Sequence, residues 1–193
     1  MEWKAWAKFC CLKLKRFLYL ISPNKINVNF YKDLEDILST KKVKYFQIRL
    51  KKYSDSKIIR ISKKVKTLTK KYKVKLIIND SPVLAKKINA DGCHLGQSDV
   101  SIKDSRNLLK KEKIIGITCH GSKKLILNAI KEKPSYIALG SFFKSKLKPN
   151  AKRAQKNLVK WCRQRTSLPI VAIGGINNKN YKSLVKFGVN YLA

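Results

Sequence analysis

The chain has 193 residues, of which 44% are hydrophobic, so its length and composition fit one globular domain with a substantial core and exclude a disordered chain. The 45 lysines and arginines outnumber the 11 acidic residues, which gives a formal net charge of +34. Such a charge indicates either an anionic partner, such as a nucleic acid, or a proteome in which lysine fills any solvated position. Because the lysines are spread over all the predicted helices and form no single stripe, we favour the second interpretation. We therefore expect no specific nucleic-acid partner, only non-specific binding of polyanions at low salt.

Residues 1–16 form a leading basic amphipathic segment. Trp3, Trp6 and Cys10 recur there at helical spacing, which is typical of a helix packed on the domain and also of a helix on a membrane surface. Lys13 and Lys15 interrupt the apolar core that a signal peptide needs. No uncharged run is long enough to span a bilayer, and the five cysteines include no C-x-x-C pair. We expect a cytoplasmic protein without a membrane span, a disulfide framework or a zinc site.

Short β-rich runs alternate with amphipathic helical runs along the rest of the chain. The expected strands are residues 17–21, 45–50, 74–78, 92–95, 114–118, 136–139 and 169–173, with a last short one at 189–193. One helical run has a single apolar stripe, made of Ile58, Ile61, Val65 and Leu68. A second begins at Ser81-Pro82, a helix cap followed by proline in the first turn. Later helical runs contain residues 108–109, 125–130, 158–161 and 184–187.

Strands that alternate with single helices predict parallel pairing through right-handed crossovers. Eight such strands predict an α/β fold of the closed TIM (β/α)8 barrel type, here with the eighth strand only a stub and the eighth helix missing. Strand count alone does not separate this barrel from a doubly wound open sheet. The dinucleotide-binding version of that sheet needs a G-x-G-x-x-G motif after its first strand, and the sequence has none. No linker or change of composition divides the chain, so we expect one barrel domain over residues 1–193.

The end of the second expected strand carries three polar side chains on one face. With a period of two, Gln47, Arg49 and Lys51 point the same way, while the apolar residues between them face the helices. In a parallel barrel this place is the catalytic mouth, where two cations and an amide would be costly without an anionic ligand. The alternative is a strand end that frays into solvent with ordinary surface charges.

Carboxylates follow the third and fourth expected strands. Asn79 and Asp80 end one apolar strand, and Asp99 lies in the loop after the next. Two carboxylates on neighbouring loops, opposite an arginine and a lysine, would hold Mg²⁺ against a diphosphate. Helix capping is the alternative role for Asn79 and Asp80.

The later strand ends carry weaker signals. Thr118 and His120 end the fifth strand and are expected on one face, although a lone histidine there is more often structural than catalytic. The loop after the sixth strand, residues 140–148, offers hydroxyl and ammonium groups to phosphate, or is a basic surface loop. Gly174 and Gly175 end the seventh strand, where exposed backbone N–H groups form a recurrent phosphate site of barrels; a plain tight turn explains them as well.

Five motifs occur in order at these strand ends: Q-I-R-L-K, I-I-N-D, A-D-G-C-H-L-G-Q-S-D, I-G-I-T-C-H and V-A-I-G-G-I. Together they resemble the thiamine phosphate synthase family over roughly residues 17–193. The resemblance implies a transferase that couples 4-amino-2-methyl-5-hydroxymethylpyrimidine diphosphate to a thiazole phosphate and releases diphosphate in a Mg²⁺-assisted dissociative substitution. The implied partners are these two small molecules, and a homo-oligomer remains open.

The resemblance also implies roles for individual residues. Asp80 and Asp99 match the Mg²⁺ carboxylates of the family. The substrate-binding positions are matched by Gln47, Arg49, Lys51, Asn79, Thr118, Ser145, Lys148 and Gly175. Among these, the catalytic group consists of Arg49, Lys51, Thr118 and Lys148, because cations and hydroxyls stabilise charge on the leaving diphosphate. Gly175 matches the backbone site for the thiazole phosphate.

The sequence departs from the family pattern in three places. The sixth loop of the family usually reads T-x-T-K, whereas this chain has Ser145, Lys146, Leu147 and Lys148, and Ser141 replaces the usual proline after Gly140. The chain also stops before the Ile-Ser contact and the eighth helix. From this end we expect a partly uncovered outer face on strand 17–21, poor stability and little activity. Two alternatives stay open: a thiazole tautomerase-like relative that uses His120 for proton transfer, and a non-catalytic basic protein that binds nucleic acid.

Overall fold

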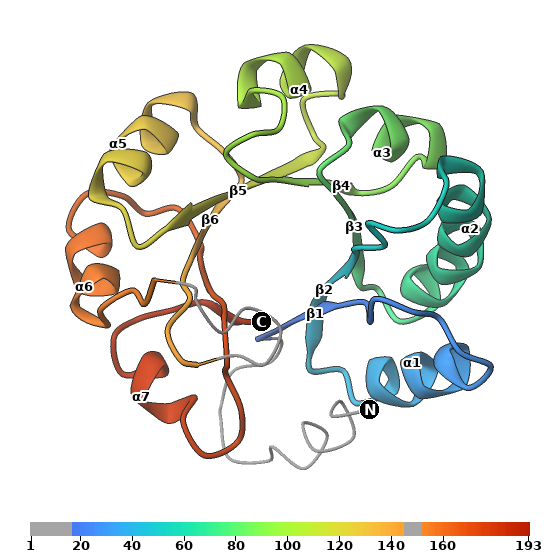
Figure 1. Ribbon diagram of the computed structural model, residues 1–193, viewed down its shortest axis with the longest axis horizontal. Helices are drawn as coiled ribbons and strands as arrows, with labels where there is room; N and C mark the ends of the chain where they lie inside the picture. The colour runs from blue at the N-terminus through green and yellow to red at the C-terminus, as the bar shows by residue number, and fades with distance from the viewer. Residues whose placement is uncertain (1–16, 145–151) are drawn as a thin grey trace.

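The computed structural model describes residues 17–144 and 152–193, and these form a closed barrel of eight parallel strands. Neighbouring strands follow one another around the barrel in chain order, and the helices surround this ring (Figure 1). The expected TIM barrel is therefore confirmed. The strands are β1 (Leu18–Ile21), β2 (Val43–Ile48), β3 (Lys75–Asn79), β4 (Gly92–Leu95), β5 (Ile114–His120), β6 (Tyr136–Leu139), β7 (Ile170–Ala172) and β8 (Tyr191–Leu192).

Seven helices connect these strands in the described part of the chain, and one of them, α1, was not located by the sequence patterns. The three central helices begin at serine caps, because Ser81, Ser101 and Ser122 each accept a hydrogen bond from the N–H of the third residue after the cap. No helix among the described residues is both long and apolar enough to cross a membrane. The helices are α1 (Phe30–Ser39), α2 (Asp55–Lys71), α3 (Pro82–Ile88), α4 (Ile102–Leu108), α5 (Lys123–Glu132), α6 (Asn157–Arg163) and α7 (Lys182–Val185).

The alternation of side chains along each strand separates two apolar clusters. The larger one lies between the barrel and its helices and includes Phe46, Ile48 and Leu50, as their spacing predicted. The smaller one contains Tyr19 and Tyr136 together with Tyr45, Ile77, Ala138 and Val171. Because these residues alternate with the outer ones, they fill the inside of the barrel. Branched aliphatic side chains usually dominate that space, so three tyrosines there are unusual.

The last strand is short, as expected, yet it closes the barrel. Residues of β8 pair with β7 on one side, and Leu192 pairs with Leu18 of β1 on the other. The N–H of Leu192 donates to the carbonyl oxygen of Phe17 at 2.9 Å. Parallel pairing on both sides of β8 therefore closes the barrel.

One expectation about this seam is wrong. The outer face of β1 was expected to be partly uncovered, but Phe17 and Leu18 are each 1% exposed and Leu20 is 6% exposed. The physical reason is that these side chains belong to the same continuous apolar cluster as Phe30 of α1 and Leu184 of α7. Helices on both sides of the seam thus contribute to the cluster that buries the outer face of β1.

Candidate active site

The mouth of the barrel at the carboxyl ends of the strands brings together the amides predicted from β2 and β3. Gln47 is 2% exposed and faces the inside of the barrel. Its side-chain Nε2 donates to Oδ1 of Asn79 at 2.5 Å. This hydrogen bond links the side chains of two neighbouring strands at the mouth.

A lysine and two carboxylates lie beside these amides. The ammonium of Lys51 is 3.1 Å from Oδ2 of Asp80, and the backbone N–H of Asp80 donates to the carbonyl oxygen of His94 at 2.7 Å. Asp99, in the loop between β4 and α4, accepts a hydrogen bond from the N–H of Gly96 at 2.6 Å. The loops after β3 and β4 thus place Asp80 and Asp99 at the same mouth.

The two carboxylates influence each other. Burial and the neighbouring carboxylate of Asp80 raise the pKa of Asp99, while the Gly96 N–H and the Lys51 ammonium act in the opposite direction. Two carboxylates whose charges repel in this way suit a divalent cation that neutralises both. No group of three or more metal-binding side chains occurs among the described residues, so a cation here would take its remaining ligands from substrate and water.

A second cation, Arg49, follows the end of β2. Its side chain is half-buried, and its backbone N–H donates to Oγ of Ser22 at 2.9 Å, which ties the end of β2 to the loop after β1. Its positive charge is close enough to act against protonation of His94. Arg49 and Lys51 therefore place positive charge at the same end of the barrel as the paired amides.

A buried chain of hydrogen bonds lies beneath the mouth, and the sequence patterns did not single it out. Thr118 Oγ1 lies 2.7 Å from His94 Nε2, and His94 Nδ1 lies 2.8 Å from the hydroxyl of Tyr136. That hydroxyl lies 2.7 Å from the hydroxyl of Tyr19. Burial lowers the pKa of His94 to about 4, so the ring is neutral at pH 7. One signal could have located His94: it alternates with two apolar residues that face the helices.

The predicted orientation of His120 is wrong. Thr118 pairs with inward-facing Ala138, whereas His120 pairs with Leu139, which packs in the outer cluster. The register shifts between Thr118 and His120, and this irregularity breaks the period of two on which the prediction rested. His120 is exposed and does not share the inward face of Thr118.

The loops after β6 and β7 lie against each other at the mouth. The N–H groups of Phe142 and Phe143 donate to the carbonyl oxygens of Ile173 and Gly174 at 3.1 and 3.0 Å. Gly175 has φ 64°, and a Cβ there would collide with the carbonyl oxygen of Lys144, so only glycine fits. The predicted residues Ser145 and Lys148 lie outside the described residues.

Comparisons with known proteins agree with this geometry. The family model described as thiamine monophosphate synthase matches residues 18–193. The chain belongs to the thiamine monophosphate synthase family. A thiamine-phosphate synthase of Pelagibacter ubique is 51% identical over 180 residues, which cover 93% of this chain and 86% of that protein. One from Saccharophagus degradans is 44% identical over 151 residues, covering 78% and 70% of the two chains.

Solved structures agree with this family assignment. A thiamine phosphate pyrophosphorylase from Pyrococcus furiosus superposes with a TM-score of 0.82 at 26% identity, covering 93% of this chain and 85% of the other. A 3-dehydroquinate dehydratase from Geobacillus kaustophilus has a TM-score of 0.68 at 10% identity, covering 92% and 82%, and this similarity shows the fold alone. The thiamine monophosphate synthase family thus has a solved member with the same barrel.

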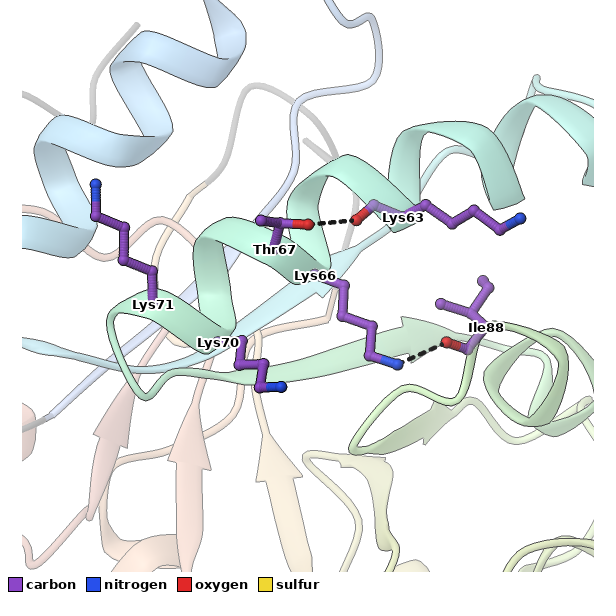
Figure 2. A pocket seen from close by; sticks show the side chains of 6 residues that line it. All are labelled: Lys63, Lys66, Thr67, Lys70, Lys71 and Ile88. Atoms are coloured by element: carbon purple, nitrogen blue, oxygen red, sulfur yellow. Dashed lines mark hydrogen bonds between the residues drawn. The ribbon is translucent and has the colours of Figure 1, made fainter.

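This member of the thiamine monophosphate synthase family also has a groove away from the mouth. A groove of about 740 Å³ is lined by the second half of α2 and the end of α3 (Figure 2). Inside it, Lys66 donates to the carbonyl oxygen of Ile88 at 3.1 Å, and Lys71 pairs with Glu35 at 2.7 Å. These helix ends lead into the amino ends of β3 and β4, so the groove lies toward the opposite end of the barrel. Its lining residues are Lys63, Lys66, Thr67, Lys70, Lys71 and Ile88.

Proposed function

We propose that this protein forms thiamine phosphate by joining 4-amino-2-methyl-5-hydroxymethylpyrimidine diphosphate to a thiazole phosphate with release of diphosphate. One observation carries the proposal: a pair of mutually repelling carboxylates, Asp80 and Asp99, lies beside Lys51 at the mouth of a barrel from this family. Relatives named thiamine-phosphate synthase support the same activity, since one is 51% identical to this chain.

The pyrimidine ring is proposed to bind at the paired amides. The hydrogen bond between Gln47 and Asn79 uses a donor of the first and the acceptor of the second. The complementary groups, Oε1 of Gln47 and Nδ2 of Asn79, can then meet a ring that presents an amino donor next to a nitrogen acceptor. An aminopyrimidine has this pattern, and burial of Gln47 fixes the position of the pair.

The diphosphate is proposed to bind on the charged side of the mouth. Mg²⁺ usually keeps several waters and uses one or two carboxylates plus substrate phosphates, which is the set that Asp80 and Asp99 would provide. When bound, the ion would neutralise negative charge on the leaving diphosphate. Lys51, which contacts Asp80, and Arg49 would add positive charge toward the same oxygens.

In the proposed reaction, a C–O bond breaks before a new C–N bond forms. The bond between the methylene carbon and the diphosphate oxygen breaks, and its electron pair leaves with the diphosphate. The electron-rich aminopyrimidine carries the positive charge until the lone pair of the thiazole nitrogen forms the new C–N bond. Backbone N–H groups near Gly175 are proposed to hold the thiazole phosphate, with Ser145 and Lys148 expected to contribute from the sixth loop. We also propose a cytosolic location, since Cys93, Cys119 and Cys162 are free, buried thiols.

Turnover of the purified protein with both substrates and Mg²⁺ tests this function. The product is separated by chromatography and detected after oxidation to a fluorescent thiochrome. D80N and D99N should each lower turnover by about 100-fold or more, because each removes a charge that holds the ion. D36N, which alters an exposed aspartate on the outside of α1, is the matched control and should keep full activity.

Two results would contradict the proposal. Mg²⁺-dependent turnover that stays unchanged in D99N would remove Asp99 from the metal site. Isomerisation of a thiazole phosphate without the pyrimidine substrate or Mg²⁺ would instead support the tautomerase alternative.

A further inference from the structure

The buried chain of hydrogen bonds beneath the mouth has a direction that can be worked out from its donors. It consists of Tyr19, Tyr136, His94 and Thr118, joined by contacts of 2.7, 2.8 and 2.7 Å. Tyr19 and Tyr136 are 3% and 0% exposed, and His94 is 7% exposed. Only Thr118, at the end of β5, is half-exposed and reaches the mouth.

Both ring nitrogens of His94 contact hydroxyl groups, and a buried imidazole held between two uncharged hydroxyls carries one ring hydrogen, so two arrangements of the hydrogen-bond chain exist. In the first, the Tyr19 hydroxyl donates to Tyr136, Tyr136 donates to Nδ1 of His94, and Nε2–H donates to Thr118. In the second, every bond is reversed, and Thr118 donates to Nε2. The second arrangement leaves the hydroxyl hydrogen of Tyr19 without an acceptor, because Tyr136 is the hydrogen-bond partner of that hydroxyl among the described residues.

The first arrangement is the one that uses every buried donor. A buried hydroxyl hydrogen without an acceptor is destabilising, so the chain should run from Tyr19 toward the mouth. The ring of His94 lies nearly parallel to that of Tyr136, with an angle of 10° between their planes, and this packing holds the imidazole in place. The carbonyl oxygen of Thr118 also accepts a hydrogen bond from Gln97 at 2.5 Å, which fixes the backbone at that point.

We infer that His94 is a positioning residue: it carries its hydrogen on Nε2, donates to Oγ1 of Thr118, and so leaves the Thr118 hydroxyl to donate to an acceptor in the mouth. The acceptor is an oxygen of a bound phosphate group, since the same mouth holds Arg49 and Lys51. This inference rests on the proposed function for the identity of the ligand, while the direction of the chain rests on the structure alone. His94 would then act on the reaction through Thr118 without touching the substrate.

The direction of the hydrogen-bond chain can be measured without any enzyme activity. The protein has two histidines, so the H120Q variant leaves the imidazole of His94 as the single histidine signal in a ¹H–¹⁵N NMR spectrum. We expect a neutral ring with its hydrogen on Nε2 at pH 7. A ring with its hydrogen on Nδ1, or a charged ring, would overturn the inference.

Two tyrosine variants make this measurement sharper. Y136F removes the donor to Nδ1, so a mixture of the two ring forms should appear. Y19F removes a hydroxyl from the same chain but leaves Tyr136 able to donate to Nδ1, so the Nε2–H form should persist. If Y19F changed the ring form as much as Y136F, the proposed direction of the chain would be wrong.

A double-mutant cycle tests the effect on catalysis. T118V and H94N should each lower kcat/KM by roughly 10- to 100-fold, the range expected for a lost hydrogen bond to a charged acceptor. Because both act through one hydroxyl, the double variant should be no worse than T118V alone. H94Q places an amide near the position of Nε2 and should recover part of the loss, whereas the shorter asparagine reaches only toward Tyr136.

The outcomes separate this inference from the proposed function. If wild-type protein forms no thiamine phosphate, the proposed function fails, and the NMR spectrum still decides the direction of the chain. If wild-type protein is active and the losses of H94N and T118V multiply, His94 does not act through Thr118, and the inference is overturned. Thermal melts identify variants that fail to fold. If H94N melts early, the cycle is repeated with Y136F, a nearly isosteric change, in its place.

Discussion

Lys51 should contribute little to folding and much to the reaction. Its ammonium lies 3.1 Å from Asp80, and the two side chains are 57% and 34% exposed. Exposed pairs of this kind contribute about 0–1 kcal/mol to the free energy of unfolding, because water screens them. Loss of a group that stabilises charge in a transition state costs about 10²- to 10³-fold in rate. K51M should therefore lower kcat/KM by about 100-fold and the free energy of unfolding by less than about 1 kcal/mol.

The chain offers a closely matched control. Lys75 lies 2.8 Å from Asp91, with side chains that are 49% and 33% exposed, but this pair lies at the start of β3, away from the mouth. K75M should match K51M in chemical denaturation and keep wild-type kcat/KM. If the two variants had equal activity, or if K51M unfolded far more easily than K75M, the assignment of Lys51 to the reaction would be refuted.

Three further predictions follow from local features of the fold. G175A should raise the KM for the thiazole phosphate at least about tenfold, because its backbone has φ 64° and no room for a Cβ. G188A, with φ 89° and a Cβ position whose nearest atoms lie 3.9 Å away, should leave that KM unchanged. Equal values for the two variants would argue against the phosphate site. Burial lowers the pKa of His94 to about 4 from an ordinary value of 6.5. As the pH falls, His94 is therefore protonated in the unfolded chain before it is protonated in the folded protein. The free energy of unfolding should decrease by about 3 kcal/mol from this residue between pH 7 and pH 4. Denaturation of wild-type protein and H94Q at both pH values measures this loss as a difference, which would be absent if His94 were already charged in the folded state. Burial also raises the pKa of Cys93 and Cys119 to about 12, so both thiols should resist iodoacetamide at pH 8 until the protein unfolds. Peptide mapping that found early label on either cysteine would contradict this.

The strand ends could be read from sequence because the barrel repeats one simple rule. Side chains alternate along each strand, so the sequence predicts Gln47 on the inside and Phe46 on the outside of the barrel, as the structure has them. The carboxylates were placed by the companion rule that polar residues at strand ends meet at one mouth. Both rules are local, and both held at β2, β3 and β4. The roles of these residues in catalysis stay predictions.

The patterns failed where long-range contacts decide the structure. The register shift in β5 turns His120 outward, and no residue of the motif I-G-I-T-C-H indicates that irregularity. The partnership of Tyr19, Tyr136 and His94 joins three strands that are far apart in sequence, so no local spacing could reveal it. The burial of β1 was also missed, since it depends on helices at both ends of the described chain.

The seam between β1 and β8 has a consequence for the order in which the fold forms. One register pair, Leu18 with Leu192, joins these two strands in the described chain, whereas β1 and β2 share four. Such distant residues meet only after the entropy of closing a long loop has been overcome, so this seam should form last and open first. Amide hydrogens of Leu192 and Ala193 should then exchange with solvent before those of β2 to β5. Gln47, Asn79 and Thr118, which are proposed to bind the pyrimidine diphosphate, belong to β2 to β5, as does His94, which positions Thr118. These groups would therefore stay assembled while the far side of the barrel opens and closes.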